Sequence, residues 1–130
     1  MSGLPKLDFP TLLALAQESA QITTECTCCT VSLESWNSVP LSLIEGNLQE
    51  IGTLLEDPFI DPTFAEFHSS GTRYDSPDAP IAPRYYPYNR CNIAKCQVCS
   101  RYFLRYTEAG GYFVDRRIRL LISERLIDAA

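Results

Sequence analysis

A CxxC motif that leads directly into two strand-like runs is the feature that most constrains the fold of this chain. Cys96 and Cys99 are separated by two residues, and the runs "YFLRYT" and "YFVDRRIRLL" follow, joined by "EAGG". Gly110 and Gly111 can adopt the positive φ of a tight hairpin turn. The segment therefore predicts a cysteine knuckle that continues into a terminal antiparallel hairpin, an arrangement typical of half a zinc ribbon.

A second cysteine group, "ECTCC", lies far upstream and offers Cys26 and Cys29 at the same CxxC spacing. Two thiolate pairs that meet in space complete a tetrahedral site, and thiolates select a borderline ion such as zinc. In a reducing cytosol, cysteines are more often metal ligands or buried thiols than disulfides. We therefore predict one structural Zn2+ bound by Cys26, Cys29, Cys96 and Cys99.

Other roles for the cysteines remain open at this stage. Cys28 could replace a neighbouring ligand, Cys91 could supply one, and His68, the only histidine, could be the fourth. Unligated core thiols are one alternative to the metal site. A redox pair is another, but the run that follows Cys99 alternates like a strand, so the helix N-terminus that activates such thiols is missing.

The remainder of the chain predicts an α+β fold with antiparallel hairpins, a zinc-ribbon-like knuckle and one or two short helices. At 130 residues the chain fits a single domain, 1–130, of which residues 1–8 are expected to form a flexible N-terminus. Asp8 is a candidate cap for a helix whose apolar residues recur at helical spacing from Phe9 to Ala16. A further short helix is expected near the C-terminus.

Other segments carry strand or loop patterns. Residues 29–36 alternate as a strand does before "NSVP" breaks the pattern, and residues 49–55 predict a strand that follows a short helix. Residues 63–76 predict a hairpin about a Ser-Ser-Gly turn. The proline-rich, aromatic segment 80–89, called the strap below, is expected to lie extended across the surface, because proline removes donors that a sheet requires.

The sequence also bears on cellular location. The N-terminal segment carries no basic leader, and no run approaches the roughly 20 apolar residues that a membrane span needs. We expect a cytoplasmic protein that makes no membrane contact.

Charge is divided unevenly along the chain. Residues 1–80 carry a net charge of −10 and residues 81–130 one of +5, which together give the total of −5. The halves could neutralise each other, with arginines of "DRRIR" pairing with acids such as Glu56, Asp57 or Glu66. Alternatively, the acidic half attracts a basic protein partner and repels nucleic acid. The candidate partner-binding acids are Glu45, Glu50, Glu56 and Asp57.

The sequence carries no catalytic pattern. With one histidine, it has neither an HExxH motif nor the histidines of a catalytic metal site, and the deaminase pattern is missing around His68. His68 is expected to be a surface turn residue. Glu108 and Asp115 flank the terminal hairpin, where acids are ordinarily solvated. We expect no enzymatic activity.

Three blocks, "CTCC", "GTRYDSPDAPIAPRYYPYNRC" and "CQVCSRYFLRYTEAGGYFVDRRIRLL", resemble those of a family of small bacterial cysteine-motif proteins. The resemblance extends from about residue 26 to residue 121 and covers most of the chain. It implies that the cysteine pairs 26/29 and 96/99 and the "YTEAGGY" hairpin are family features. It also implies a role as an immunity protein of a contact-dependent or type VI toxin system.

Three functional hypotheses follow. The first is a zinc-stabilised protein-binding module, an immunity or inhibitor protein that neutralises a basic toxin, for example a nuclease, by covering its active site with carboxylates. The second is a zinc-ribbon-like nucleic-acid module, which the acidic net charge disfavours. Its phosphate contacts would be Arg84, Arg90, Lys95, Arg101 and Arg105, and its stacking residues Tyr85, Tyr86, Tyr88, Tyr102 and Tyr106. The third is a small accessory subunit whose zinc is purely structural.

Overall fold

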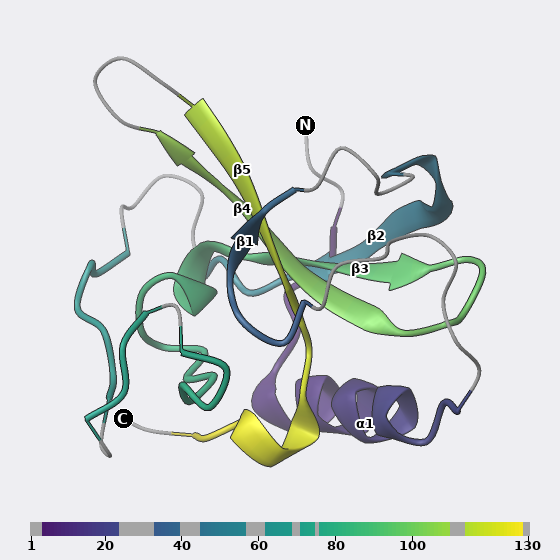
Figure 1. Ribbon diagram of the computed structural model, residues 1–130, viewed down its shortest axis with the longest axis horizontal. Coiled ribbons are helices and arrows are strands. Elements are labelled where there is room, and N and C mark those ends of the chain that lie inside the picture. The colour runs from purple at the N-terminus through teal and green to yellow at the C-terminus, as the bar shows by residue number, and fades with distance from the viewer. Residues whose placement is uncertain are drawn as a thin grey trace.

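A five-stranded antiparallel sheet forms the centre of the computed structural model, with the strand order β1-β5-β4-β3-β2 (Figure 1). The structure describes residues 4–23, 33–39, 45–56, 62–68, 71–74, 76–109 and 114–128. The strands are β1 (Asn37–Ser38), β2 (Leu48–Thr53), β3 (Asn92–Cys96), β4 (Tyr102–Ala109) and β5 (Val114–Leu120). Among these residues the small single α+β domain also has one α-helix, α1 (Phe9–Ala20), and three 3-10 turns, η1 (Glu45–Asn47), η2 (Tyr88–Arg90) and η3 (Ser123–Arg125).

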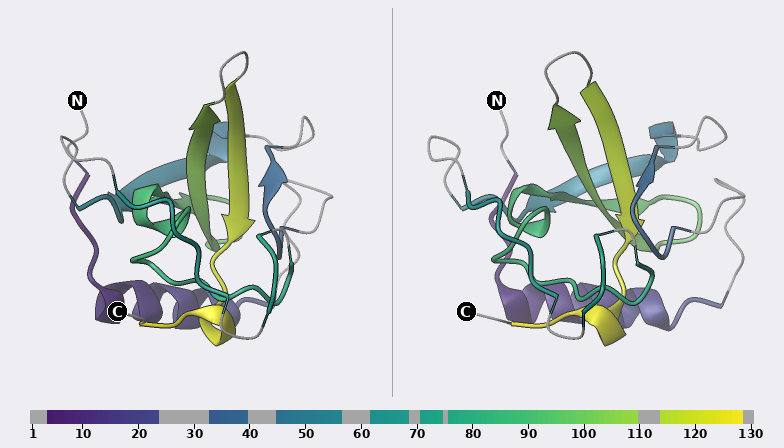
Figure 2. Two further views of the ribbon diagram at one scale, coloured as in Figure 1. Left: turned by 90° about the vertical axis from the view of Figure 1, so that its left-hand side faces the viewer. Right: turned by 60° about the vertical axis from the view of Figure 1, so that its left-hand side comes forward.

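The terminal hairpin predicted from the sequence is confirmed. β4 pairs with β5 from Phe103 opposite Leu120 to Ala109 opposite Val114. The pairing of β3 with β4 reaches only as far as Arg105, so the end of the hairpin extends beyond the rest of the sheet. The views in Figure 2 show the β4–β5 hairpin projecting away from α1.

The helix predicted near the N-terminus is confirmed as well. The Asp8 carboxylate accepts a hydrogen bond of 2.9 Å from the backbone N–H of Thr11, which caps the first turn. That hydrogen bond lowers the pKa of Asp8. Leu12 and Ala16, one turn apart, are fully buried. The helix therefore covers one face of the sheet with a narrow apolar stripe (Figure 1).

Alternation along the strands produces two apolar clusters, one on each side of the sheet. The cluster on the helix side includes Leu12 of α1, Ile93 of β3 and Leu104 of β4. The cluster on the opposite side is formed by Leu33, Leu48, Ala94, Cys96, Cys99, Phe103 and Ile118. The CxxC cysteines therefore belong to the side of the sheet that α1 does not cover.

Several sequence-based expectations were wrong in position. The strand expected over 29–36 is absent from its described part, residues 33–36, and the strand lies instead at Asn37–Ser38. In the described parts of the segment expected as a hairpin, 63–68, 71–74 and 76, the structure has no strand. The expected C-terminal helix is the single turn η3, and the expected helix before β2 is the turn η1. The strand predicted over 49–55 is confirmed as β2.

The strap is an integral part of the core rather than a surface cover. Ile81 and Ala82 are buried, as are Pro87 and Tyr88 near its end. Ile81 also pairs with the C-terminal tail, since its N–H donates to the Arg125 carbonyl at 2.7 Å. The expectation of a surface segment failed because the strap has polar partners that are not sheet partners.

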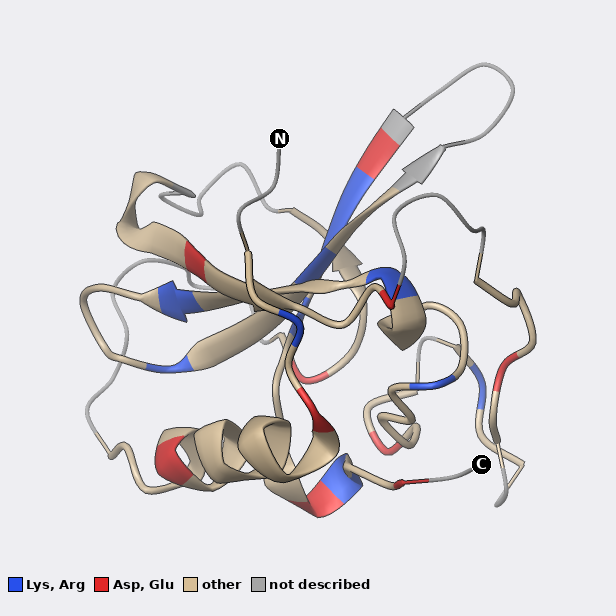
Figure 3. Cartoon of the chain, turned by 180° about the vertical axis from the view of Figure 1, so that it is seen from behind, with Lys and Arg blue, Asp and Glu red and all other residues tan. Residues whose placement is uncertain are grey.

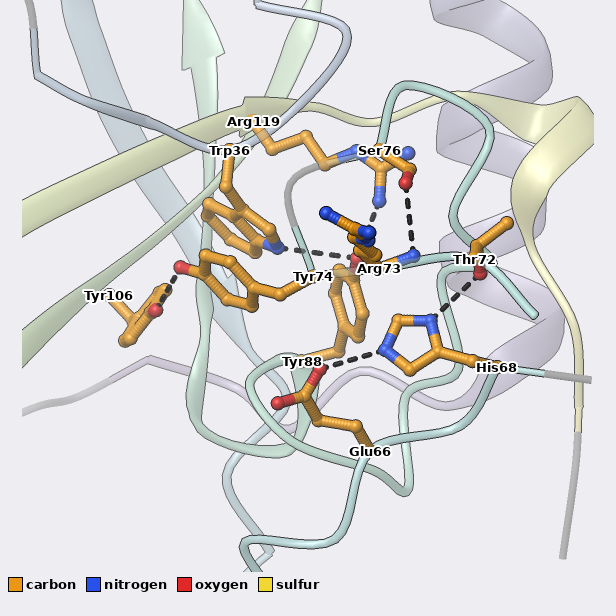
Figure 4. A network of polar contacts seen from close by, with 10 residues as sticks. All are labelled: Trp36, Glu66, His68, Thr72, Arg73, Tyr74, Ser76, Tyr88, Tyr106 and Arg119. Atoms are coloured by element: carbon orange, nitrogen blue, oxygen red, sulfur yellow. Dashed lines mark hydrogen bonds and ion pairs between the residues drawn. The ribbon is translucent and has the colours of Figure 1, made fainter.

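A fully buried guanidinium contacts Tyr88 of the strap and the carbonyls of the segment just before it. Arg119 of β5 donates from Nη2 to the carbonyls of Pro77 and Ala79, at 3.1 and 3.0 Å, and from Nε to the carbonyl of Glu34 at 2.8 Å. Its Nη1 donates to the hydroxyl of Tyr88. Burial raises the pKa of Tyr88, so this hydroxyl is neutral. Figure 4 shows Arg119 beside Trp36 and Tyr88 in this network.

The N-terminal segment lies against β2. The Leu7 N–H donates to the Thr53 carbonyl at 2.9 Å, and the Thr53 N–H donates to the Pro5 carbonyl at 3.0 Å. Residues 5–7 of the segment expected to be flexible thus extend the sheet at its β2 edge. Within the described residues, no helix is both long and apolar enough to cross a bilayer.

Candidate functional site

The CxxC motif forms the turn between β3 and β4. The N–H of Ser100 donates to the Cys96 carbonyl at 2.8 Å, and the N–H of Cys96 donates to the Arg101 carbonyl, also at 2.8 Å. Ser100 has a φ of 68°, which closes the turn in the left-handed region. Cys96 and Cys99 are both buried, at 0% and 5% exposure. The turn therefore places two thiols at one end of the sheet, away from solvent.

The other two predicted zinc ligands, Cys26 and Cys29, lie outside the described residues, as does Cys28. The described residues on either side of that segment lie near the CxxC turn. The Ile22 carbonyl accepts a hydrogen bond of 3.2 Å from Arg101, and Leu33 packs in the same apolar cluster as Cys96 and Cys99. In the described part of the chain, no group of three or more metal-ligating side chains is present.

Cys91 and His68, the alternative ligands, have other surroundings. Cys91 is fully buried in the helix-side cluster, on the other side of the sheet from Cys96, and its Sγ lies 3.3 Å from the Pro87 carbonyl. Burial raises the pKa of the Cys91 thiol well above its ordinary value. Cys91 is therefore a neutral core thiol. His68 contacts Glu66 and Thr72 in the loop before the strap.

A polar ladder crosses four strands, β2, β3, β4 and β5, on the sheet face opposite α1. The Arg105 guanidinium of β4 lies 3.3 Å from the Glu50 carboxylate of β2, and the Asn92 amide of β3 donates to the same oxygen at 3.2 Å. Asn92 and Arg105 are register partners, and so are Thr107 and Arg116 on the neighbouring strands. The ladder continues the face that carries Phe103 and Ile118, so this face is apolar near the CxxC turn and polar toward the hairpin.

An open groove of about 780 Å³ lies over the polar ladder. Tyr106 and Thr107 both line it although adjacent strand residues point to opposite faces, so both sides of β4 contribute to its wall. Among the described residues its charged lining comprises two carboxylates and five bases: Glu50, Glu56, Lys6, Arg90, Arg105, Arg116 and Arg117. The N-terminal segment forms one side of the groove and the β4–β5 hairpin another. We refer to it as the hairpin groove.

Basic residues are therefore gathered here although the chain as a whole is acidic. Figure 3 shows blue segments on β5 and on the N-terminal segment, whereas the charged segment of α1 is red. Arg117 is paired with Asp115 at 2.9 Å, and Lys6 is paired with Glu56 at 3.3 Å. Counting these acids, the hairpin groove keeps a net positive charge.

Arg90 forms a rigid part of the groove wall. Its guanidinium carbon lies 4.3 Å from the ring centroid of Phe64 and 4.8 Å from that of Tyr86, so the cation is held between two aromatic rings. Its Nη2 donates to the carbonyls of Pro62 and Thr63 at 3.1 and 3.0 Å. Phe64 remains 67% exposed, so an apolar surface adjoins this charge.

The acids predicted to meet a basic partner do not form one open acidic face. Asp57 and the side chain of Glu45 lie outside the described residues. Glu50 and Glu56 both line the hairpin groove, and each lies 3.3 Å from a cation, Arg105 and Lys6 respectively. Of the "DRRIR" arginines, Arg117 lies 2.9 Å from Asp115 and Arg119 donates to carbonyls, while Glu66 contacts His68.

The residues of the nucleic-acid hypothesis are dispersed through the fold. Tyr88, Tyr102 and Tyr106 are buried, so their rings are covered by the core and present no face to a base. Burial and hydrogen bonds to Tyr74 and Tyr86 raise the pKa of Tyr106, which keeps it a neutral phenol. Tyr85 and Tyr86 are half-buried, and their rings pack at a tilt against Phe67 and Phe64 respectively.

A carboxylate, an imidazole and a hydroxyl are connected in the loop before the strap. Glu66 Oε1 lies 2.7 Å from His68 Nε2, and His68 Nδ1 lies 2.8 Å from Thr72 Oγ1 (Figure 4). A nucleophilic hydroxyl would need such a base together with donors for a developing oxyanion. These three residues come from one short loop and do not line the hairpin groove. Their contacts fix the loop conformation.

Sequence reasoning found part of the hairpin groove and missed the rest. Arg90, Arg105, Glu50 and Glu56 were identified, as were Arg116 and Arg117 within "DRRIR", although in different roles. Asn92 and Lys6 were not. Strand alternation could have placed Arg105 and Thr107 on one face, but the registers with Asn92 and Arg116 depend on pairings that a sequence does not specify.

Comparisons with family models, with curated proteins and with solved structures gave no match to this chain. The resemblance to the bacterial cysteine-motif family therefore remains a prediction from the quoted blocks. The functional argument rests on the geometry of the hairpin groove and of the CxxC turn.

Proposed function

We propose that this chain is a non-catalytic protein-binding domain and that the hairpin groove is its binding site. The groove itself carries this proposal: its volume of about 780 Å³ falls in the range of ligand sites, and its lining combines five cations with the exposed edge of a projecting hairpin. Arginines and aromatic rings, which flank the groove, are enriched among the residues that dominate protein interfaces.

An immunity protein that inhibits a toxin is one specific kind of protein-binding domain. Binding by a small inhibitor needs a complementary surface on one partner and no chemistry of its own, which agrees with the absence of a catalytic motif from the sequence. The net charge of −5 favours a basic toxin as the partner at long range, as steering acts over the whole molecule. Recognition in the groove would be a separate, local contact.

Site-specific photo-cross-linking in cells of the source organism tests the proposal. A cross-linking amino acid at Thr107, which is exposed in the hairpin groove, should capture a protein partner. The same amino acid at Gln17, exposed on α1, is the matched control and should capture none. Capture only at Gln17, or none at Thr107, would reject the groove as the binding site. A captured toxin encoded beside this gene would support the immunity role.

We also propose that a structural Zn2+ joins Cys26 and Cys29 to Cys96 and Cys99. Cys26 follows Ile22 by four residues and Cys29 precedes Leu33 by four, so each is within about 14 Å of a described residue near the CxxC turn. Four thiolates would hold the ion, which would act as a cross-link between distant parts of the chain. A cytoplasmic, reducing location would keep these thiols available for the metal.

A further inference from the structure

The β4–β5 hairpin has an open strand edge where it projects beyond the sheet (Figure 2). Successive residues of an antiparallel strand direct their backbone N–H and carbonyl groups to alternate sides. The Leu121 N–H donates to the Tyr102 carbonyl at 3.0 Å, so in the β4–β5 register the even-numbered residues of β4 are hydrogen-bonded to β5. The odd-numbered residues of β4 therefore direct their backbone groups to the other edge, where β3 lies.

β3 covers only the first part of that edge. Its last partner on β4 is Arg105, which pairs with Asn92, and before Asn92 the chain turns into η2 instead of continuing as a strand. Thr107 and Ala109 are the next two residues of β4 on this edge. Among the described residues, nothing hydrogen-bonds to their outward N–H and carbonyl groups. Open edges are ordinarily blocked by a charged side chain, a proline or a bulge, and the exposed Thr107 provides none of these.

The hairpin groove continues the position of β3 along this edge. In the sheet, β3 is the single strand between β4 and β2. Thr107 of β4 lines one side of the groove, and Leu55 and Glu56, which follow β2, line another. A strand added to β4 would lie about 4.8 Å from it, as β3 does. A second copy of this chain, pairing through its own β4, would bring its β5 as well and would need the width of two strands. The groove therefore suits one extended segment.

The two faces of the groove determine the side-chain pattern of such a segment. A residue that exchanges hydrogen bonds with Thr107 has its side chain on the same face as that of Thr107, which is the face of the polar ladder. The next residue of the segment would face the other side. There Tyr106 lines the groove, and its ring centroid lies 6.1 Å from that of Tyr86. A segment that alternates polar and apolar residues would match both faces.

We propose that the hairpin groove binds one extended segment of a partner protein, which adds to β4 as an antiparallel strand. This inference rests on the proposed function, since it names the kind of segment that the groove accepts. The main chain of the segment would exchange hydrogen bonds with Thr107 and Ala109, and its apolar residues would face Tyr106. In strand addition the main-chain hydrogen bonds supply affinity and alternate side chains supply specificity, so the segment needs no particular net charge.

Amide hydrogen exchange measured by NMR tests the inference with a strand-forming probe. The probe is a peptide of about eight residues that alternates threonine and valine, and its two matched controls are N-methylated on the threonines or on the valines. Threonines on the ladder face would direct their N–H groups to β4, and the valine N–H groups would face away.

We expect the probe to slow exchange of the Thr107 N–H by about tenfold or more. The peptide methylated on valine should have the same effect, and the peptide methylated on threonine should have none. Equal effects of the two methylated peptides would overturn the proposal, and so would a Thr107 N–H that no peptide protects.

Protein variants locate the binding. Thr107→Pro removes the open N–H and costs no hydrogen bond to β5, because that N–H points away from β5. Thr107→Val keeps the N–H and a branched side chain, so it is the matched control. By fluorescence anisotropy, Thr107→Pro should weaken binding of the labelled probe by about tenfold or more, and Thr107→Val should change it by less than about twofold. Equal binding by the two variants would overturn the proposal. Thermal melts check the folding of both, and if Thr107→Pro is unfolded the methylated peptides decide.

Cross-linking in cells separates this inference from the proposed function. A cross-linking amino acid at Arg116, exposed in the groove, should capture a partner in the Thr107→Val background and lose it in the Thr107→Pro background. Capture in both backgrounds would mean that the groove binds protein through side chains alone, so the inference fails and the proposed function stands. No capture from Thr107 or Arg116 would reject both. Capture of a second copy of this chain would reject the partner segment.

Discussion

Arg119 lies on β5 with its guanidinium inside the domain and connects three separate parts of the chain. Its acceptors are the carbonyls of Glu34, Pro77 and Ala79 and the hydroxyl of Tyr88. None of these partners is a carboxylate, so the desolvation of one buried charge is offset by hydrogen bonds to neutral groups. Arg119 thus supplies the segment just before the strap with hydrogen-bond donors that a neighbouring strand would otherwise provide.

Arg119→Met should lower the free energy of unfolding by about 3 kcal/mol or more, because the buried Ala79 carbonyl and Tyr88 hydroxyl and the part-buried carbonyls of Glu34 and Pro77 lose their donor, at roughly 1–3 kcal/mol for each buried group. Arg116→Met on the same strand is the matched control. Arg116 is exposed, so its replacement should change stability by less than about 0.5 kcal/mol. Urea denaturation of both variants measures the difference, and equal effects would show that the buried network contributes nothing.

Ser100 illustrates the opposite case, a residue whose backbone is unfavourable. Its φ of 68° is costly for a side chain that has a Cβ. Ser100→Gly should therefore raise the free energy of unfolding by about 0.5–1 kcal/mol, and Ser100→Val should lower it. Thermal denaturation checks both signs. Destabilisation by glycine would mean that the serine side chain makes a contact worth more than the strain.

At the scale of elements, the segments with strong local signals were predicted and the others were not. The helix α1 follows from an Asp cap and helical spacing, and the β4–β5 hairpin follows from alternation around two glycines. The strand predicted over 29–36 is absent from its described part, 33–36, because β1 forms at Asn37 and Ser38, where they meet β5. The strap was expected at the surface but is buried. The carbonyls of Pro77 and Ala79, just before it, accept hydrogen bonds from Arg119, about forty residues later in the chain, and no local sequence pattern reveals this contact.

The candidate site shows the same division. The CxxC turn follows from spacing alone, and the structure places Cys96 and Cys99 together as expected. The hairpin groove requires three registers and a folded N-terminal segment, none of which the sequence specifies. Glu50 and Glu56 from the acidic half of the chain, residues 1–80, therefore line the same groove as arginines from the basic half, residues 81–130.

Gly52 fixes how the N-terminal segment packs on β2. A Cβ at this position would lie 2.6 Å from Cγ of Leu7, closer than real contacts allow. Gly52→Ala should lower the free energy of unfolding by about 1–3 kcal/mol, and the loss should shrink in a Leu7→Ala background. Gly46→Ala, where a Cβ meets nothing within 4 Å, is the matched control and should be nearly neutral. A double-mutant cycle by urea denaturation measures the coupling, and purely additive effects would contradict the packing of Leu7.

At the scale of the whole molecule, the proposed zinc site predicts a shared dependence on metal and thiols. A chelator should lower the melting temperature, because the ion binds the folded state alone. Cys99→Ser should abolish this chelator effect, whereas Val98→Ser in the same turn, at a position 53% exposed, should preserve it. Native mass spectrometry under reducing conditions gives the metal content directly. If the measured mass is that of the metal-free chain and the chelator does not change the melting temperature, Cys96 and Cys99 are core thiols and not zinc ligands.

The strand order also bears on how the protein is made. Every strand pairing in the described sheet includes β3, β4 or β5, so it needs residues beyond position 91. During synthesis, at about 5–20 residues per second, β1 and β2 would emerge several seconds before any of their partners. Throughout that interval α1 has no sheet to cover, and the edge of β2 is exposed to other nascent chains. We therefore expect the domain to fold only after its C-terminal third has been synthesised. Chaperone binding should be strongest on nascent chains of about ninety residues, whose strands have no partners yet.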